Sequence, residues 1–214
     1  MDSHQNDYYA KKLAQFGHTY KAVGWSSRQS QRKRFDAIAS QINVEDYTKE
    51  NPLTLLDVGC GLGDFYHYIK LKKLPCVYTG IDSCPQMIAA AKKSYPNGNF
   101  LVSALDNYID ARLNQPKFAV VVANGVFNIK GPNMVDNMVK QLKNCLQLAS
   151  ISVLVTMLTD KTPAKWQQNK LFFYYNNTKI DNLLKNQAIK TQWTFGYLPN
   201  DMLLNASNNR GLET

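Results

Sequence analysis

Three glycines at alternate positions, Gly59, Gly61 and Gly63, follow an apolar run and lead directly into an amphipathic segment that begins at Asp64. A glycine-rich turn between a strand and a helix lets the backbone approach a bound ligand closely. The first such turn of an open α/β sheet lies at the carboxyl ends of the strands, where these folds bind their ligands. The segment therefore predicts a ligand site at residues 56–64.

The spacing and the charges of this loop indicate which ligand it binds. The pattern Gly-x-Gly-x-Gly differs from the dinucleotide fingerprint, in which two residues precede the third glycine and pyrophosphate sits on the helix N-terminus. Asp57 stands just before the glycines and Asp64 directly after them, and negative charge there repels phosphate and attracts an ammonium group. The loop thus favours the amino-acid end of a cationic ligand, such as a methionine moiety.

A further carboxylate follows the next apolar run. Asp82 ends the segment Thr79-Gly80-Ile81-Asp82 and lies about twenty residues after the glycines, where nucleotide-binding folds carry the acid that holds a ribose diol. A carboxylate accepts hydrogen bonds from both hydroxyls there. A glycine turn with an incidental aspartate is the alternative, but the glycines, the acids and the strand context together favour a nucleoside site.

Two asparagines follow a later apolar run, which covers residues 118–123. Asn124 and Asn128 are expected at the sheet edge that holds the glycine loop, because such sheets bind ligands beyond the carboxyl ends of their strands. There they can hydrogen-bond a cofactor or a second substrate, and Asn128 is also a weak catalytic candidate. The alternative is that both asparagines only shape a turn, a role that suits this residue type.

The first fifty residues are helical in pattern, with candidate helices at 8–16 and 30–42 and a loop at 24–27. Folded over the site as a lid, this segment would exclude water from the reaction centre. Packing of the segment's tyrosines on the sheet is the alternative. The side chains that a lid would bring to the site are Tyr8, Tyr9, Trp25, Ser26 and Gln31.

Candidates for a catalytic base are few. His18 lies in the loop Gly17-His18-Thr19 and has the right chemistry near neutral pH, although a loop histidine is more often a surface residue. Tyr9 is a second weak candidate. Tyr174 and Tyr175 could line a pocket for the second substrate, but an aromatic pair is more often part of the core.

After Pro52 the sequence changes to short apolar runs that alternate with amphipathic segments, which is typical of an α/β fold with a mostly parallel sheet. The turn at 197–200 separates two late strands, so the sheet is predicted to end in an antiparallel hairpin. The expected strands cover residues 54–58, 77–81, 100–103, 118–123, 151–157, 189–195 and 202–206. The expected helices of this part cover residues 64–72, 85–95, 132–148 and 178–186.

A chain of 214 residues with 44% hydrophobic residues is long enough for one domain with a sizeable core. The apolar runs are too short to cross a bilayer, and the four cysteines lack the paired spacing of a zinc site. These features predict a cytoplasmic protein with reduced thiols, no membrane span and no bound metal.

The net charge of +9 is spread along the chain. Only Arg28, Arg32, Lys33 and Arg34 form a dense basic cluster, on a predicted helix where Arg28 and Arg32 share one face. We interpret this cluster as a solvated helix face, with a nucleic-acid footprint as the alternative.

Several of these segments together resemble the class I S-adenosylmethionine-dependent methyltransferases. They are residues 56–64 (LDVGCGLGD), 78–82 (YTGID) and 85–88 (PQMI), followed by Ala89, Ala91 and Pro96. The likeness extends to a subset of small, mostly uncharacterised bacterial methyltransferases. It does so through residues 24–27 (GWSS), Ser30-Gln31, Arg34-Phe35, 118–130 and 197–200 (YLPN), and so spans nearly the whole chain.

The resemblance implies a Rossmann-like fold with a seven-stranded, mostly parallel sheet, an antiparallel last strand and helices on both faces. Residues 1–50 would form a helical lid or cap, and residues 51–214 the methyltransferase domain, within a single domain overall. The resemblance also implies S-adenosyl-L-methionine as cofactor and S-adenosyl-L-homocysteine as product. Asp57 and the glycines would contact the methionine portion, and Asp82 the ribose.

One departure from the family pattern concerns adenine. The third strand of this family usually ends in Gly-Asp, whose acid contacts the adenine amino group, and Ser103-Ala104 stands there in this sequence. Backbone groups near Ala104 and Leu105, or the side chain of Asp106, are the expected substitutes. The predicted cofactor-binding residues are Asp57, Gly59, Cys60, Gly61, Gly63, Asp82, Ser83, Met87, Ala104, Leu105, Asn124, Gly125, Trp25, Ser26 and Gln31.

Methyl transfer from a sulfonium is an in-line displacement, in which alignment and a preorganised environment supply much of the catalysis, so no unique catalytic residue is required. Gly125 and Val126 stand where enzymes that methylate nucleobase amino groups often carry two prolines, which disfavours a nucleobase acceptor. The predicted function is methyl transfer to a small polar metabolite. The alternatives are a methyltransferase acting on RNA or protein and a cofactor-binding protein without transferase activity, and the oligomeric state is left open.

Overall fold

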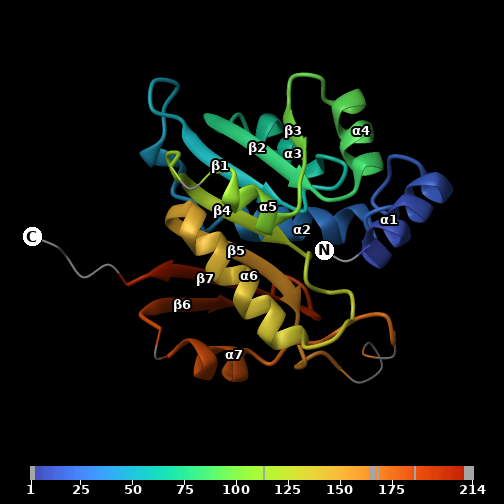
Figure 1. Cartoon of the computed structure of the whole chain (residues 1–214), viewed down its shortest axis with the longest axis vertical. Helices are drawn as coiled ribbons and strands as arrows, with labels where there is room; N and C mark the ends of the chain where they lie inside the picture. Colours follow the sequence, from blue (N-terminus) through green and yellow to red (C-terminus); the bar gives the residue numbers. More distant parts are fainter. Residues whose placement is uncertain (1–2, 113, 164–166, 168, 186, 210–214) are drawn as a thin grey trace, which may run out of the picture.

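The fold is that of a computed structural model, which describes residues 3–112, 114–163, 167, 169–185 and 187–209. Its strands form one seven-stranded sheet in the order β3-β2-β1-β4-β5-β7-β6 (Figure 1). The strands are β1 (Leu53–Val58), β2 (Cys76–Asp82), β3 (Asn99–Val102), β4 (Phe118–Asn124), β5 (Ala149–Leu158), β6 (Ile189–Thr194) and β7 (Asp201–Asn208).

The sheet is parallel from β3 to β5 and changes direction at β7. β1 pairs in parallel with β2 and β4, β2 pairs with β3, and β4 pairs with β5. β7 runs antiparallel to both β5 and β6 and lies between them. The mixed seven-stranded sheet and its antiparallel hairpin, both predicted from the sequence, are therefore confirmed.

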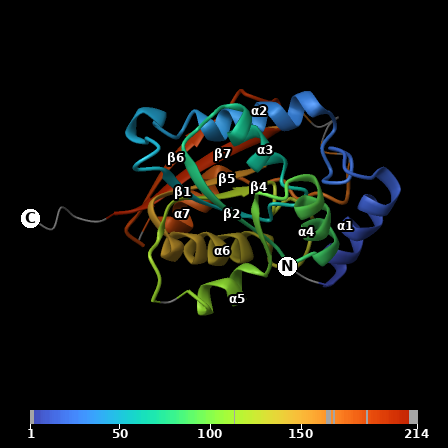
Figure 2. The ribbon, with the colours of Figure 1, turned by 90° about the horizontal axis from the view of Figure 1, so that it is seen from above.

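Helices cover both faces of the sheet, as Figure 2 shows from above. On one face, α2 (Arg28–Ala39), α3 (Asp64–Leu71) and α4 (Pro85–Ser94) bury side chains such as Ile38 and Phe65 in one core. On the other face, α5 (Leu105–Asp110), α6 (Met134–Leu148) and α7 (Asn177–Leu184) form a second core around Leu142. Val121 and Val122 belong to opposite cores, because successive residues of a strand point to opposite faces.

The N-terminal helix α1 (Ser3–Phe16) lies beside α4 (Figure 1). Its apolar side chains pack on a small cluster that includes Leu62 and Met87. The Asn6 amide donates to the Ser83 carbonyl at 3.1 Å, and the Ser83 hydroxyl donates to Asn6 Oδ1 at 2.7 Å. α1 is thus docked against the glycine loop and the turn between β2 and α4. A short 3-10 helix, η1 (Val44–Asp46), lies between α2 and β1.

The observed elements differ from the predicted ones mainly at their ends. The helix predicted at 30–42 begins at Arg28, because Ser27 and Ser30 cap each other's backbone N–H groups at 2.9 and 3.2 Å. α5 was not predicted, since six residues give less than two turns of periodicity. The predicted end of the late helix, Asn186, lies outside the described residues, and α7 ends at Leu184.

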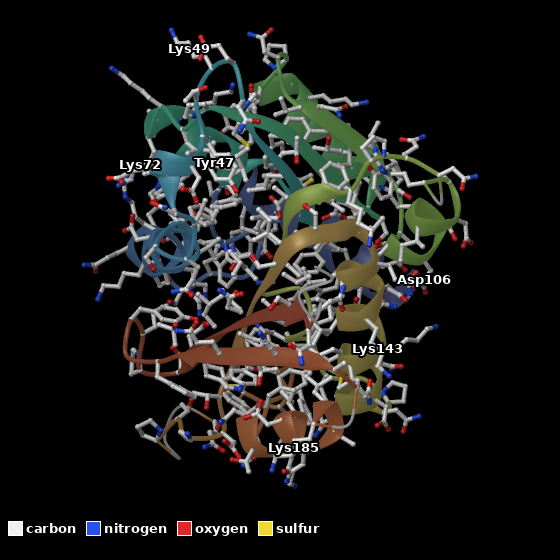
Figure 3. The ribbon with its side chains drawn as sticks, turned by 90° about the vertical axis from the view of Figure 1, so that its left-hand side faces the viewer. Tyr47, Lys49, Lys72, Asp106, Lys143 and Lys185 are labelled. Atoms are coloured by element: carbon white, nitrogen blue, oxygen red, sulfur yellow. The ribbon has the colours of Figure 1, made fainter. Side chains whose placement is uncertain are left out.

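None of the helices in the described part of the chain has the length and apolar character needed to cross a membrane. Positive charge is dispersed over the surface. Lys49, Lys72, Lys143 and Lys185 are exposed and point outward from separate parts of the molecule (Figure 3), in agreement with the even distribution along the sequence.

Candidate active site

The carboxyl ends of β1, β4 and β5 meet the first residue of β7 at one edge of the sheet. The register of β1 and β4 pairs Val58 with Ala123, so the next residues, Gly59 and Asn124, follow at the same edge. Leu158, at the end of β5, pairs with Asp201, because β7 runs in the opposite direction and begins where the other strands end. A cavity of about 260 Å³ opens at this edge, and we call it the active-site cavity.

The glycine loop forms one wall of the active-site cavity. Gly59, Cys60 and Gly61 line it. Gly59 and Gly61 have φ angles of 69° and 53°, a left-handed backbone that favours glycine. Gly63 is not among the lining residues. It turns the chain into α3, and a Cβ at this position would lie 2.8 Å from the ring of Phe100, so its glycine is explained by packing.

Two buried carboxylates flank the loop within the cavity lining, Asp57 at 2% and Asp82 at 8% exposure. Burial raises the pKa of Asp57 to about 7, although the Tyr78 hydroxyl donates to it at 2.6 Å. Asp82 accepts the N–H groups of Gly61 and Cys84 at 3.0 and 2.8 Å, and burial still raises its pKa. The ionised form of each carboxyl group is therefore only partly stabilised within the protein, and a ligand that brings a positive charge or further hydroxyl groups would stabilise it.

The third acid of the loop, Asp64, also lines the cavity and is held from the N-terminal segment. Gln31 donates to Asp64 Oδ2 at 2.8 Å, and a ring nitrogen of His18 lies 3.4 Å from Oδ1. The other ring nitrogen of His18 lies 2.8 Å from the hydroxyl of Ser94 on α4. His18 is not among the lining residues of the cavity, so the structure places this candidate base at the joint between α1, α3 and α4.

The other side chains assigned to a lid reach the cavity. Tyr8, Tyr9, Trp25, Ser26 and Gln31 all line it. Met87, at the start of α4, lines it as well. Ser83 does not, and its hydroxyl is used to hold α1 through Asn6.

Trp25 lies over the end of β4. A Cβ added to Gly125, whose φ is 71°, would approach Trp25 Cη2 to 2.5 Å. The Arg34 guanidinium lies 4.3 Å from the centroid of the Trp25 ring. Glycine at 125 therefore makes room for an indole ring that belongs to the N-terminal segment.

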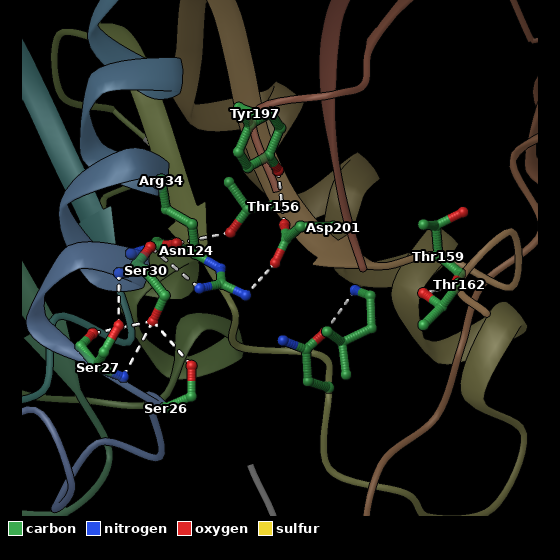
Figure 4. A network of polar contacts seen from close by, with 12 residues as sticks. Ser26, Ser27, Ser30, Arg34, Asn124, Thr156, Thr159, Thr162, Tyr197 and Asp201 are labelled. Atoms are coloured by element: carbon green, nitrogen blue, oxygen red, sulfur yellow. Dashed lines mark hydrogen bonds and ion pairs between the residues drawn. The ribbon is translucent and has the colours of Figure 1, made fainter. Parts of the chain in front are cut away.

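The interpretation of the basic cluster 28–34 as a solvated face is wrong for Arg34. Arg28, Arg32 and Lys33 are exposed, whereas Arg34 is 4% exposed and lines the cavity. It forms an ion pair with Asp201 (Figure 4), whose other oxygen accepts the Tyr197 hydroxyl at 2.6 Å. Despite this pair, burial raises the pKa of Asp201 to about 6. A cation this deep in the fold requires such a partner.

Asn124 and Asn128 both line the cavity, and their amide oxygens are held by the sheet. The Thr156 hydroxyl donates to Asn124 Oδ1 at 2.6 Å (Figure 4). The Leu158 N–H donates to Asn128 Oδ1 at 3.1 Å. Each asparagine is thus fixed by the neighbouring strand β5.

A second cavity, of about 740 Å³, adjoins the first, and Tyr8, Gly59 and Val126 line both. Its lining includes Ala104, Leu105 and Asp106, the residues expected near adenine. The side chain of Asp106 points outward beside α6 (Figure 3), where it accepts the amides of Asn144 at 2.7 Å and Gln141 at 3.2 Å. Asp106 therefore lines the second cavity and is also hydrogen-bonded to α6, and Ala104 and Leu105 belong to the same lining.

Comparison with known proteins relates the segment that carries the glycine loop to a protein family. Residues 56–150, from the glycine loop to the start of β5, match the family model described as a methyltransferase domain. Residues 56–150 thus have the sequence features of a methyltransferase domain. The matched family model agrees with the resemblance to methyltransferases seen in the sequence, and the seven-stranded fold agrees with the one that the resemblance implies.

Relatives of this methyltransferase domain are similar in part or in fold. "Putative methyltransferase Rv1506c" of Mycobacterium tuberculosis is 31% identical over 84 residues, which cover 37% of this chain and 45% of that protein. The matched segment thus spans less than half of that relative. A crystal structure of the plantazolicin methyltransferase BpumL has a TM-score of 0.63 at 16% identity over 97% of this chain and 98% of that chain. An S-adenosylmethionine-dependent methyltransferase from Clostridium acetobutylicum ATCC 824 has a TM-score of 0.64 at 11% identity over 93% and 98%.

The residues that line the active-site cavity but were not predicted as site residues include Arg34, Phe172 and Asn200. Arg34 had a usable signal, because it lies four residues before the core residue Ile38 and hence on the same helix face. Phe172 belongs to the segment between β5 and α7 and Asn200 to the turn before β7, where no periodic pattern marks a position as facing a cavity.

Proposed function

We propose that this methyltransferase domain transfers a methyl group from S-adenosylmethionine to a small polar acceptor. The observation that carries the proposal is the pair of buried carboxylates, Asp57 and Asp82, beside a glycine loop in the lining of one cavity. Burial raises the pKa of both carboxyl groups, so a cation or a pair of hydroxyls is favoured against them. A nucleoside with a positively charged amino-acid tail supplies both.

The residues present fit such a cofactor. Asp57 would hold the ammonium group, Asp82 the ribose hydroxyls, and the backbone at Ala104 and Leu105 the adenine in the adjoining cavity. Aromatic faces from the N-terminal segment, Tyr9 and Trp25, would surround the sulfonium, which is favourable for a cation. Crystal structures of BpumL with a similar fold contain S-adenosylhomocysteine, one of them together with a triazolic desmethylplantazolicin analogue.

The size and position of the active-site cavity favour a small acceptor. A volume of about 260 Å³ is modest, and the N-terminal segment forms part of its wall. Displacement at a sulfonium needs alignment and exclusion of water more than a particular catalytic residue. An RNA or protein acceptor has less support, because Arg34 is internal and the exposed lysines are dispersed. These features support a small polar metabolite as the acceptor.

Calorimetry with S-adenosylmethionine and S-adenosylhomocysteine tests the proposal. Both should bind, and Asp82→Ala should weaken both at least tenfold, because charge-assisted hydrogen bonds to the ribose are lost. The same change also leaves the N–H groups of Gly61 and Cys84 without their acceptor, at a cost of about 1–3 kcal/mol of stability each.

Asp110→Ala is the matched control, since Asp110 is exposed at the end of α5. It should leave both affinities unchanged. Absence of binding to either ligand by the folded protein would remove the proposal. Binding without turnover over a broad acceptor panel would instead support a cofactor-binding protein that lacks transferase activity.

A further inference from the structure

Part of the active-site cavity lies away from the glycine loop, and we call it the acceptor wall. It combines residues from α2, from the ends of β4 and β5, from the segment before α7 and from the turn before β7. They are Arg34, Asn128, Leu158, Phe172, Tyr174 and Asn200.

The amide of Asn128 has a fixed orientation in this wall. A backbone N–H can only donate, so the atom that faces the Leu158 N–H at 3.1 Å is the amide oxygen. The amide nitrogen must then point elsewhere. Asn128 is 6% exposed and lines the cavity, and Nδ2 has no acceptor among the described residues. Asn128 therefore presents a preoriented donor in the cavity lining, which a bound molecule can satisfy.

The side-chain amide of Asn124, at the end of β4, is oriented in the same way. Its oxygen accepts the Thr156 hydroxyl at 2.6 Å, and Thr156 is fully buried in β5. The nitrogen of this amide is likewise unpaired within the described part of the chain. Two amide nitrogens at the carboxyl edge of β4 thus favour an acceptor molecule that itself carries hydrogen-bond-accepting oxygens.

The described residues of the acceptor wall include no group suited to remove a proton. Asp201 is occupied by its ion pair with Arg34 and by the hydrogen bond that it accepts from the Tyr197 hydroxyl. Burial raises the pKa of Tyr9 and of Tyr174, which keeps both phenols protonated near neutral pH. The carboxylates in the cavity lining, Asp57, Asp64 and Asp82, all belong to the glycine loop or to the end of β2. An acceptor that must lose a proton to react would therefore find no general base in this wall.

We propose that the methyl acceptor is a carboxylic acid, which this chain converts into a methyl ester, and this proposal rests on the function proposed above. A carboxylate is already ionised at neutral pH, so it needs donors and alignment only. It also meets the sulfonium with opposite charge. One carboxylate oxygen accepts a hydrogen bond from Nδ2 of Asn128, while the other oxygen attacks the methyl carbon. The new C–O bond forms as the C–S bond breaks, and the electron pair of the C–S bond stays on sulfur. The products are a neutral ester and neutral S-adenosylhomocysteine, and no proton moves.

The test uses the full chain and S-adenosylmethionine with a tritiated methyl group. The acceptors are a panel of carboxylic acids, each paired with its primary amide, and a protein-free metabolite extract. Label should pass to acids and not to their amides. Mild base should release it as volatile methanol, because methyl esters hydrolyse there and methyl ethers or methylamines do not.

Base-stable label in the product overturns the carboxylic-acid proposal and leaves the methyltransferase proposal intact. So does the absence of transfer to any acid or extract when calorimetry shows that the cofactor binds. Failure of the cofactor itself to bind is a different result, because it removes the function on which this inference rests.

A variant of the wall gives an independent measurement. Asn128→Asp keeps an acceptor for the Leu158 N–H and replaces the donor with a negative charge. The KM for the carboxylic acid should rise at least tenfold, while the affinity for S-adenosylmethionine changes less than twofold. Asn107→Asp adds the same charge on an exposed position of α5 and should change neither. Loss of cofactor affinity instead would assign Asn128 to the cofactor and contradict the proposal. Should Asn128→Asp fail to fold, the comparison of acids with amides on the unaltered protein decides.

Discussion

Asp57 is the residue whose charge state the proposed ligand should control. Burial raises its pKa to about 7 in the empty site. A cation bound beside it stabilises the carboxylate and lowers this pKa, so binding below neutral pH must release a proton. The affinity for S-adenosylmethionine should therefore rise with pH up to about 7 and then level off. At one pH unit below the pKa only about a tenth of the carboxyl groups are ionised, which predicts binding about tenfold weaker at pH 6 than at pH 8.

Calorimetry in buffers of different ionisation enthalpy measures both the affinity and the released proton. Asp57→Asn should bind weakly at every pH and lose most of the pH dependence. It keeps an amide oxygen toward the Tyr78 hydroxyl, which donates to Asp57 in the native chain. An affinity that stays flat between pH 6 and pH 8 in the unaltered protein would show that Asp57 does not meet the cation.

At the scale of elements, the contact between the loop before α2 and the end of β4 depends on one glycine. Gly125→Ala places a methyl group 2.5 Å from Trp25 Cη2 in the native arrangement, so the indole must leave its position over the cavity. We expect methyl transfer to fall at least tenfold and the tryptophan fluorescence to change. The left-handed φ of 71° adds a stability loss of about 1–2 kcal/mol.

Gly196→Ala separates the two effects. Gly196 has a φ of 87°, and a Cβ there meets nothing within 4 Å. It should lose a similar amount of stability without loss of activity or change in fluorescence. A second comparison adds Gly125→Ala to a Trp25→Ala protein. The indole is absent there, so the added methyl group has nothing to clash with at Cη2. Equal activity of the Gly125→Ala and Gly196→Ala proteins would show that the position of Trp25 is unimportant.

The elements that the sequence predicted share a physical property. Strand β4 is an almost continuous apolar run, and β1 and β2 are mostly apolar. Helices α3, α4 and α6 carry apolar residues at helical spacing, so the local order of residues indicates which of them are buried. α5 is too short for such a pattern. The segment between β5 and α7 is held by individual polar contacts, such as that of Asn176 with Asp160 at 2.7 Å, which depend on residues brought together only by folding.

For the molecule as a whole, the ion pair between Arg34 and Asp201 joins the N-terminal segment to the reversed strand β7. Both side chains are almost fully buried, so removal of one leaves the other uncompensated. Arg34→Met should destabilise the protein by about 3–5 kcal/mol. The double change Arg34→Met with Asp201→Leu should cost clearly less, because no buried charge remains. Urea unfolding followed by circular dichroism measures both values.

Arg28→Met is the matched control, since Arg28 is exposed at the start of the same helix. It should change stability by less than about 0.5 kcal/mol. A single cooperative transition in every variant is also expected, because α2 packs in the same core as β1 and β4. A double variant as unstable as Arg34→Met would show that the charge is not what matters at this position.

The same scale explains which half of the site the sequence predicted. The loop and Asp82 that would hold the cofactor lie within residues 56–82, in motifs whose spacing is set by one strand-helix-strand unit. The acceptor wall draws on residues 34, 128, 158, 172, 174 and 200, and no local pattern ties these positions together. In the sequence, Arg34 resembles the three exposed cations around it, because its ion-pair partner Asp201 lies far along the chain.

The position of β7 also has a consequence for the order in which the protein forms during synthesis. β6 pairs with β7, and among the described strands it has no other neighbour in the sheet. A growing chain can therefore close β1 to β5 as its N-terminal part emerges, but β6 must wait for residues 201–208 before it has a place. Arg34 also lacks its ion-pair partner, Asp201, until these residues are in place. Until the ribosome has released them, the nascent protein holds an unpaired cation and an open edge on β5, and it should depend on chaperones most in this last interval.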